Sequence, residues 1–220
     1  MNYRKFLSVL VCLLLPKKRK PAALRLMGHE VEDGVSIGPS FVWSHLRLSS
    51  GASIGPLNVI KVEELRMGPL ASIGTMNWLT SPSAARRERF RDSSFRGEGV
   101  LVLLEGAAIT SRHLVDVTSS VTVGRGSIVA GYRSQLITHA VDLHAVRQKS
   151  ACIRIGDGCF LGTGCIVLPG ILFPPGSVLA AGSVLVGSPK VSGLYGGSPA
   201  RLLREGAYES FMFRSDYFID

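Results

Sequence analysis

Five histidines and a few nearby carboxylates carry the proton-transfer chemistry that this sequence offers. An imidazole has an unperturbed pKa near 6.5, so it can accept a proton at neutral pH and release it again. We single out His139, in the segment ITHAVD, because this segment interrupts the regular pattern of the surrounding chain. A carboxylate that accepts a hydrogen bond from the other ring nitrogen would orient the imidazole, and both Asp142 and Asp116 are candidates for that role.

The four cysteines do not indicate a disulfide framework, and no CxxC pair occurs among them. Cys159 and Cys165 lie six residues apart because the chain itself repeats with that period, so we expect both to be core residues. Cys152 has no evident partner base. The pattern predicts reduced thiols in a reducing compartment and argues against a nucleophilic cysteine.

A six-residue repeat predicts the elements that must position these side chains. From residue 155 onward, apolar anchors recur every six residues, and mostly small residues follow each anchor by four. The anchors are Ile155, Leu161, Val167, Phe173, Leu179 and Leu185, and the small positions are Cys159, Cys165, Ile171, Ser177, Ser183 and Pro189. An amphipathic helix would repeat near 3.6 residues, so each unit must be a short strand followed by a corner. Stacked units of this kind form an all-β parallel solenoid.

The same pattern continues upstream with interruptions. Val117, Val123 and Val129 share one phase, Leu103, Ile109 and Val115 are offset by two, and earlier pairs with the same step are Ile54 with Ile60 and Met67 with Ile73. Residues 77–98 and 135–152 break the period and are expected to be loops that leave the coil. We therefore divide the chain into an N-terminal segment over 1–30, a β-helix over 31–195 and a closing segment over 196–220.

Composition and charge limit the classes of partner that this chain is expected to bind. With 46% apolar and 19% charged residues the chain is an ordered globular protein, and its net charge of +9 is concentrated in clusters at 17–20 and 86–96. These clusters are not interleaved with aromatic residues, which argues against nucleic acid. The cluster at 86–96 is either a solvated loop or a clamp on an anionic group.

An apolar run over 6–15, flanked by cations, is too short to span a bilayer as a helix. It suits either peripheral contact of residues 1–20 with an anionic membrane surface or packing of a terminal helix on the protein's own core. No cleavage site follows it, so we expect a cytoplasmic protein, with the inner face of the cell membrane as its possible docking surface.

Two blocks of sequence resemble the hexapeptide-repeat acyltransferases, which are left-handed parallel β-helices. IGDGCFLGTGCIVLPGILFPPGSVLAAGSVL, from residue 155, is similar to the last coils of that family, and GGSPARLLRE, from residue 196, is similar to its closing segment. The block SSVTVGRGSIVAGYRSQLITHAVDL resembles the section that leads into the catalytic loop. The resemblance implies homotrimers with active sites between subunits, acetyl coenzyme A as acyl donor, no resident metal, short terminal helices, and a sugar or polysaccharide precursor as acceptor of O-acetylation.

The resemblance also implies roles for particular residues. His139 matches the catalytic histidine, Thr163 the position beside the bound thioester, Ala181 a pantetheine contact, and Arg201 and Arg204 the cations near the coenzyme's phosphates.

Two further residues are candidates on other grounds. We expect backbone N–H groups around Gly162 to stabilise the oxyanion, because small residues in a groove expose the backbone. His113, in SRHLVDV, is a candidate for lining the same groove and binding substrate.

Two other functions stay open. His139 and His144 are separated by four residues and, with His113, could supply three ligands to a zinc ion, as in the γ-class carbonic anhydrases. Alternatively, the solenoid is a non-catalytic scaffold at a membrane. The histidine in its loop favours the enzyme over the scaffold.

Overall fold

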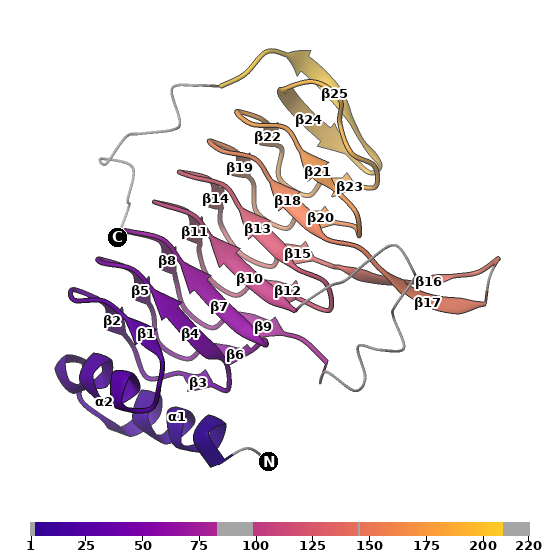
Figure 1. Cartoon of the computed structure of the whole chain (residues 1–220). Coiled ribbons are helices and arrows are strands. Elements are labelled where there is room, and N and C mark those ends of the chain that lie inside the picture. The colour runs from indigo at the N-terminus through magenta and orange to yellow at the C-terminus, as the bar shows by residue number, and fades with distance from the viewer. Residues whose placement is uncertain (1–2, 83–98, 145, 209–220) are drawn as a thin grey trace.

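The computed structural model describes residues 3–82, 99–144 and 146–208. In this part of the chain, short parallel strands stack into three sheets that form the sides of a prism, with helices at one end (Figure 1). The predicted left-handed parallel β-helix is confirmed.

Each coil contributes one strand to each sheet, so the strand order within a sheet follows the order of the coils. The first sheet contains β1 (Glu30–Val31), β4 (His45–Leu48), β7 (Glu64–Met67), β10 (Val100–Leu103), β13 (Val121–Val123), β18 (Ile153–Ile155) and β21 (Leu172–Phe173). The second contains β2 (Ser36–Ile37), β5 (Ser53–Ile54), β8 (Ser72–Ile73), β11 (Ala108–Ile109), β14 (Ile128–Val129), β19 (Phe160–Leu161), β22 (Val178–Leu179), β24 (Gly193–Gly197) and β25 (Ala200–Glu205). The third contains β3 (Phe41–Val42), β6 (Val59–Lys61), β9 (Trp78–Thr80), β12 (Leu114–Asp116), β15 (Gln135–Leu136), β20 (Ile166–Val167) and β23 (Val184–Leu185).

The six predicted anchors are the inward-facing ends of β18 to β23, and all six are buried. Five of the six small positions are buried as well, including Cys159 and Ser177. Pro189 is the exception: it is only partly buried, because it follows β23, the last strand of the third sheet. The upstream anchors with the offset phase, such as Leu103 and Val115, are also fully buried.

The repeat is interrupted at one corner, where the third sheet connects to the first. The predicted phase shift lies there, between Val115 at the third sheet and Val123 at the first. In sequence, both predicted excursions fall between a strand of the third sheet and the next strand of the first sheet, and both predictions started them too early. Residues 77–98 include β9, which belongs to the coil, and 83–98 lie outside the described residues, as does the whole cationic cluster at 86–96.

The second excursion, predicted over 135–152, begins with β15, which also pairs within the third sheet. The part that leaves the coil is an antiparallel hairpin of β16 (His139–Asp142) and β17 (Arg147–Ser150), which projects from the side of the prism (Figure 1).

Close stacking of the coils explains why glycine occurs at the corners. A Cβ added to Gly124 would lie 2.3 Å from the carbonyl oxygen of Gly156 in the next coil. Neither backbone can yield without breaking the ladder between β13 and β18, so only glycine fits at this position.

The N-terminal segment closes one end of the β-helix. It consists of α1 (Tyr3–Leu14), a 3₁₀ turn (Lys17–Arg19) and α2 (Lys20–Leu26). Val9, Cys12 and Leu24 are buried. The buried ammonium of Lys20 donates to the carbonyl of Cys12 at 2.5 Å and ties the two helices together. Within the described residues, no helix is long and apolar enough to cross a membrane.

The closing segment extends the second sheet. β24 pairs with β22 in parallel, and β25 folds back on β24 as an antiparallel strand. The described part of this segment is therefore a hairpin and not a helix, and residues 209–220 lie outside the described residues.

Candidate functional site

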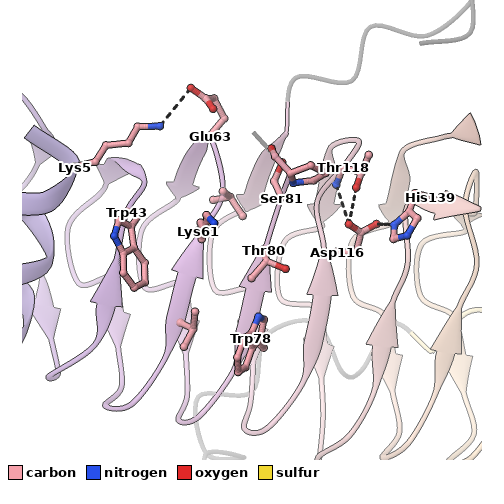
Figure 2. A pocket seen from close by; sticks show the side chains of 13 residues that line it. Lys5, Trp43, Lys61, Glu63, Trp78, Thr80, Ser81, Asp116, Thr118 and His139 are labelled. Carbon is pink, nitrogen blue, oxygen red and sulfur yellow. Dashed lines mark hydrogen bonds and ion pairs between the residues drawn. The ribbon is translucent and has the colours of Figure 1, made fainter. Parts of the chain in front are cut away.

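The loop histidine meets a carboxylate from the preceding coil. The Nδ1 atom of His139 lies 2.8 Å from Oδ2 of Asp116, which sits at the end of β12. The two residues are far apart in sequence but adjacent in space, because β12 and β15 are neighbours in the third sheet (Figure 2). Of the two candidate carboxylates, Asp116 is therefore the one that orients this imidazole.

Five hydrogen bonds converge on the Asp116 carboxylate. Oδ1 accepts the backbone N–H and the hydroxyl of Thr118 at 3.2 and 2.7 Å. Oδ2 accepts the backbone N–H and the hydroxyl of Thr138 at 2.9 and 2.8 Å, together with His139. Burial by itself would raise the pKa of Asp116, but the bonds from Thr118, His139 and Thr138 outweigh burial and hold the pKa below its ordinary value.

An ionised carboxylate only accepts hydrogen bonds, so it fixes the tautomer of the imidazole. Nδ1 of His139 must carry the proton that is donated to Asp116, and in the neutral ring Nε2 is then the unprotonated nitrogen. This arrangement is that of a general base with its basicity directed to one atom.

The second candidate carboxylate, Asp142, lies elsewhere on the hairpin. Its Oδ2 is 3.5 Å from the ammonium of Lys149 on the opposite strand, and its Oδ1 accepts the backbone N–H of His144. These bonds stabilise the hairpin and its turn, and the orienting role predicted as an alternative for Asp142 falls to Asp116.

His113 does not line the same groove as His139. Its side chain is buried, Nε2 lies 2.8 Å from the hydroxyl of Thr110, and Nδ1 accepts the backbone N–H of Ser134. Burial lowers its pKa to about 4, so the ring is neutral at physiological pH. With both nitrogens occupied, His113 is a structural residue, and neither nitrogen is available for the predicted substrate contact.

A groove of about 940 Å³ opens beside the dyad of His139 and Asp116. It runs along the outer side of the third sheet, and α1 contributes Lys5 to its lining. Both tryptophans of the chain, Trp43 and Trp78, line it as well (Figure 2). The groove has the volume of a small-molecule site, and His139 is part of its lining.

The residues expected to bind the acyl donor lie at another corner. Gly162 and Thr163 connect β19 to β20, and Ala181 lies in the equivalent connection of the next coil, between β22 and β23. Arg201 and Arg204 are exposed on β25. None of these five residues lines the groove that contains His139. One protomer therefore does not bring the predicted donor residues to the dyad.

The oxyanion role expected around Gly162 does not agree with the hydrogen bonds there. The N–H of Gly162 donates to Leu179 at 2.8 Å, and that of Gly164 donates to Tyr132 at 2.9 Å. A Cβ on Gly162 would lie 2.7 Å from the backbone nitrogen of Ala181, so this glycine is required for coil stacking. The hydroxyl of Thr163 bridges to Tyr132, donating to its carbonyl and accepting from its N–H.

The zinc alternative lacks a ligand set. Among the described residues, no three His, Cys, Asp or Glu side chains lie together as a metal site requires. His113, the third ligand of that hypothesis, uses both ring nitrogens within the core.

The cysteine prediction agrees with the structure at the two repeat positions. Cys159 and Cys165 are buried, and burial raises the pKa of both, to about 11 for Cys159. Neither is a thiolate at neutral pH.

Sequence reasoning missed five residues of the groove and site: two threonines, two tryptophans and one lysine. Thr118 and Thr138 donate hydrogen bonds to Asp116. The feature of the sequence that could have identified them is their position beside the phase shift and the loop. Trp43, Trp78 and Lys61 face the groove from outward positions of β-strands or the residue after one. A search for large aromatic residues at outward positions of the repeat would have found both tryptophans.

Comparison with solved structures identifies the fold. A hexapeptide-repeat-containing acetyltransferase from Vibrio cholerae O1 biovar eltor, complexed with acetyl coenzyme A, is similar at 16% identity over 92% of this chain and 84% of that chain, with a TM-score of 0.50. A mutant of AntD, an N-acyltransferase from Bacillus cereus in complex with dTDP and coenzyme A, is similar at 12% identity over 84% of this chain and 87% of that chain, with a TM-score of 0.55. The polysialic acid O-acetyltransferase OatWY shares 14% identity over 80% of this chain and 83% of that chain, with a TM-score of 0.42.

No protein-family model matches the chain, and no curated protein sequence matches it significantly. The structural likenesses lie below 25% identity, so they establish the fold: the chain has the hexapeptide-repeat β-helix that these acyltransferases share. The resemblance seen in the sequence is confirmed at that level.

Proposed function

We propose that this protein is an acyltransferase that moves an acetyl group from acetyl coenzyme A to a hydroxyl of a sugar or polysaccharide precursor. The observation that carries the proposal is the 2.8 Å bond between His139 Nδ1 and Asp116 Oδ2 beside a groove of substrate size. The shared fold supports it, because one similar structure is an acetyltransferase complexed with acetyl coenzyme A.

The dyad supplies the step that uncatalysed transfer lacks. A hydroxyl is a weak nucleophile until its proton is removed, so Nε2 of His139 takes that proton as the oxygen attacks the thioester carbonyl. The tetrahedral intermediate then collapses, the carbon–sulfur bond breaks, and the departing thiolate receives the proton back. Asp116 stabilises the imidazolium between these steps because it stays ionised and hydrogen-bonded.

A second candidate is transfer to an amine, since AntD is an N-acyltransferase. Transfer to oxygen is preferred here because an oriented base is needed most when the nucleophile is a hydroxyl. The nature of the product decides between them: an ester is cleaved by mild hydroxylamine, whereas an amide survives.

The acyl donor is proposed to bind between subunits. Thr163 and Ala181 lie at the corner between the second and third sheets, while the dyad lies at the corner between the third and first. A neighbouring copy that presents its donor corner to this dyad completes the site, and a closed ring of three identical contacts does this for every copy.

We also propose that the N-terminal segment docks on an anionic membrane. One face of α1 packs on the core, but Leu14 and Leu26 are 76% and 91% exposed. Residues 1–29 contain seven lysines and arginines and no acidic residue. Exposed apolar side chains beside the exposed cations Lys17 and Lys18 fit the interface of an anionic leaflet, and we propose the inner face of the cell membrane as the docking surface.

His139→Gln should lower kcat for acetyl transfer by about 10² to 10⁴, because the general base is lost. Asp116→Asn should lower kcat by about 100-fold or more, because an amide no longer fixes the tautomer. Thiol release from acetyl coenzyme A with a panel of sugars measures both, and Asp142→Asn on the same hairpin is the matched control. Full activity of either dyad variant, with native circular dichroism, would contradict the mechanism.

Co-expression of His139→Gln with Ala181→Tyr should restore activity if each site is shared between copies. Each variant alone is inactive, but a mixed ring contains contacts that combine an intact dyad with an intact donor corner. Random mixing gives about a quarter of wild-type activity. Activity that stays at the level of the single variants would place dyad and donor in one protomer.

Lys17→Ala combined with Lys18→Ala should weaken binding to phosphatidylglycerol vesicles by roughly 30-fold, since each cation near an anionic surface contributes about 1 kcal/mol. Vesicle co-sedimentation at low salt measures the effect. The control combines Arg154→Ala with Lys190→Ala, two exposed cations of the last coils. Equal binding of both double variants, or equal binding to neutral vesicles, would refute membrane docking.

A further inference from the structure

The groove extends well beyond the dyad. Its lining reaches from His139, which follows β15, past β12, β9 and β6 to Trp43, which follows β3. These strands are consecutive in the third sheet, so the groove crosses four strand spacings, or about 19 Å. This length exceeds what a single sugar at the dyad would occupy.

Two indole rings lie along this path. Trp78 is 58% exposed at the start of β9, and Trp43 is half-buried after β3, with its ring 5.9 Å from that of Phe41. Figure 2 shows both rings away from the dyad, on the outer side of the sheet. The core beneath is filled by inward residues such as Leu79, so the indoles are not needed to fill the interior.

The strands next to the two rings are far enough apart for the indoles to contact different units of one ligand. β3 and β9 are separated by β6, so the strands that carry the rings are two spacings, or about 10 Å, apart. A pyranose ring has an apolar face of C–H groups and a polar edge of hydroxyls, which suits an indole face beside threonine side chains. Thr80 lies on β9 with Trp78 and lines the groove, and Thr118, which is buried against Asp116, lines it near the imidazole.

The side chain of Lys61 supplies a cation on the strand between those next to the two rings. Lys61 lies on β6 directly opposite Thr80 of β9 and is exposed. Lys5 is 3.6 Å from Glu63, whereas Lys61 forms no ion pair within the described part of the chain. An unpaired ammonium beside aromatic surfaces is suited to a carboxylate or phosphate carried by the ligand.

We propose that the acceptor is an extended acidic glycan that lies along the third sheet. Its acylated unit sits at His139, sugar rings stack on Trp78 and Trp43, and an anionic group binds Lys61. The position of the reacting unit rests on the proposed acyl transfer. Binding of the glycan to Trp43, Trp78 and Lys61, which we call the platform, does not depend on catalysis.

Calorimetric titration without acyl donor tests the platform. The probes are oligogalacturonides and oligomannuronates from monosaccharide to hexasaccharide, with maltooligosaccharides as neutral counterparts and UDP-glucose as a nucleotide-linked sugar. Affinity for the acidic series should rise with length and exceed that for the neutral series. Trp43→Ala and Trp78→Ala should each weaken hexasaccharide binding about tenfold. Lys61→Ala should remove the preference for the acidic series, and Leu172→Ala, an exposed side chain of the first sheet, should change nothing.

The outcomes separate the platform from the chemistry. If the wild type transfers no acetyl group to any acceptor, but the wild type and His139→Gln both bind the hexasaccharide, the proposed function is wrong and the binding platform is supported. If both tryptophan variants still transfer acetyl groups to monosaccharides, and affinity for the oligosaccharides does not depend on their length, the platform is wrong but the proposed function is not. The platform is also overturned if UDP-glucose binds more tightly than the acidic hexasaccharides. Dissociation of the oligomer in the tryptophan variants, seen by light scattering, would show that the rings belong to a subunit contact.

Discussion

The parallel ladder between coils is the constraint on which the rest of the structure depends. Ile155 pairs with Phe173 eighteen residues later, and every coil must return to register in all three sheets. Extra residues can therefore leave only at a corner, and in this chain they leave mainly where the third sheet meets the first. Asp116, Thr118, Thr138 and His139 lie at that corner, so the coil positions the base of the hairpin that carries the imidazole.

The Asp116 carboxylate orients the imidazole of His139 at this corner. It is buried and would be costly to ionise alone, but hydrogen bonds from two threonines and one histidine compensate. The same bonds join two successive coils at the base of the hairpin. Structural support and control of the imidazole therefore come from one group, and a single substitution at Asp116 perturbs both.

The sequence predicted the coil better than it predicted the site. Strict spacing from Ile155 to Leu185 specifies buried strand ends, because a solenoid repeats its environment as well as its residues. Loop bounds were less predictable: Trp78 and Gln135 look polar or irregular in sequence but pair as strands because neighbouring coils impose the register. The choice between Asp116 and Asp142 depended on which coil edge faces the loop, and the sequence left both carboxylates open. His113 was misjudged because its spacing says nothing about the Thr110 and Ser134 partners that enclose it.

The central claim is that Asp116 fixes the proton of His139 on Nδ1 and leaves Nε2 as the base. Nitrogen-15 NMR of the histidine side chains at mildly alkaline pH, assigned with His139→Gln, tests it most directly. We predict a protonated Nδ1 and an unprotonated Nε2 in the wild type, and a mixture of tautomers in Asp116→Asn. A wild-type ring with its proton on Nε2 would contradict the account.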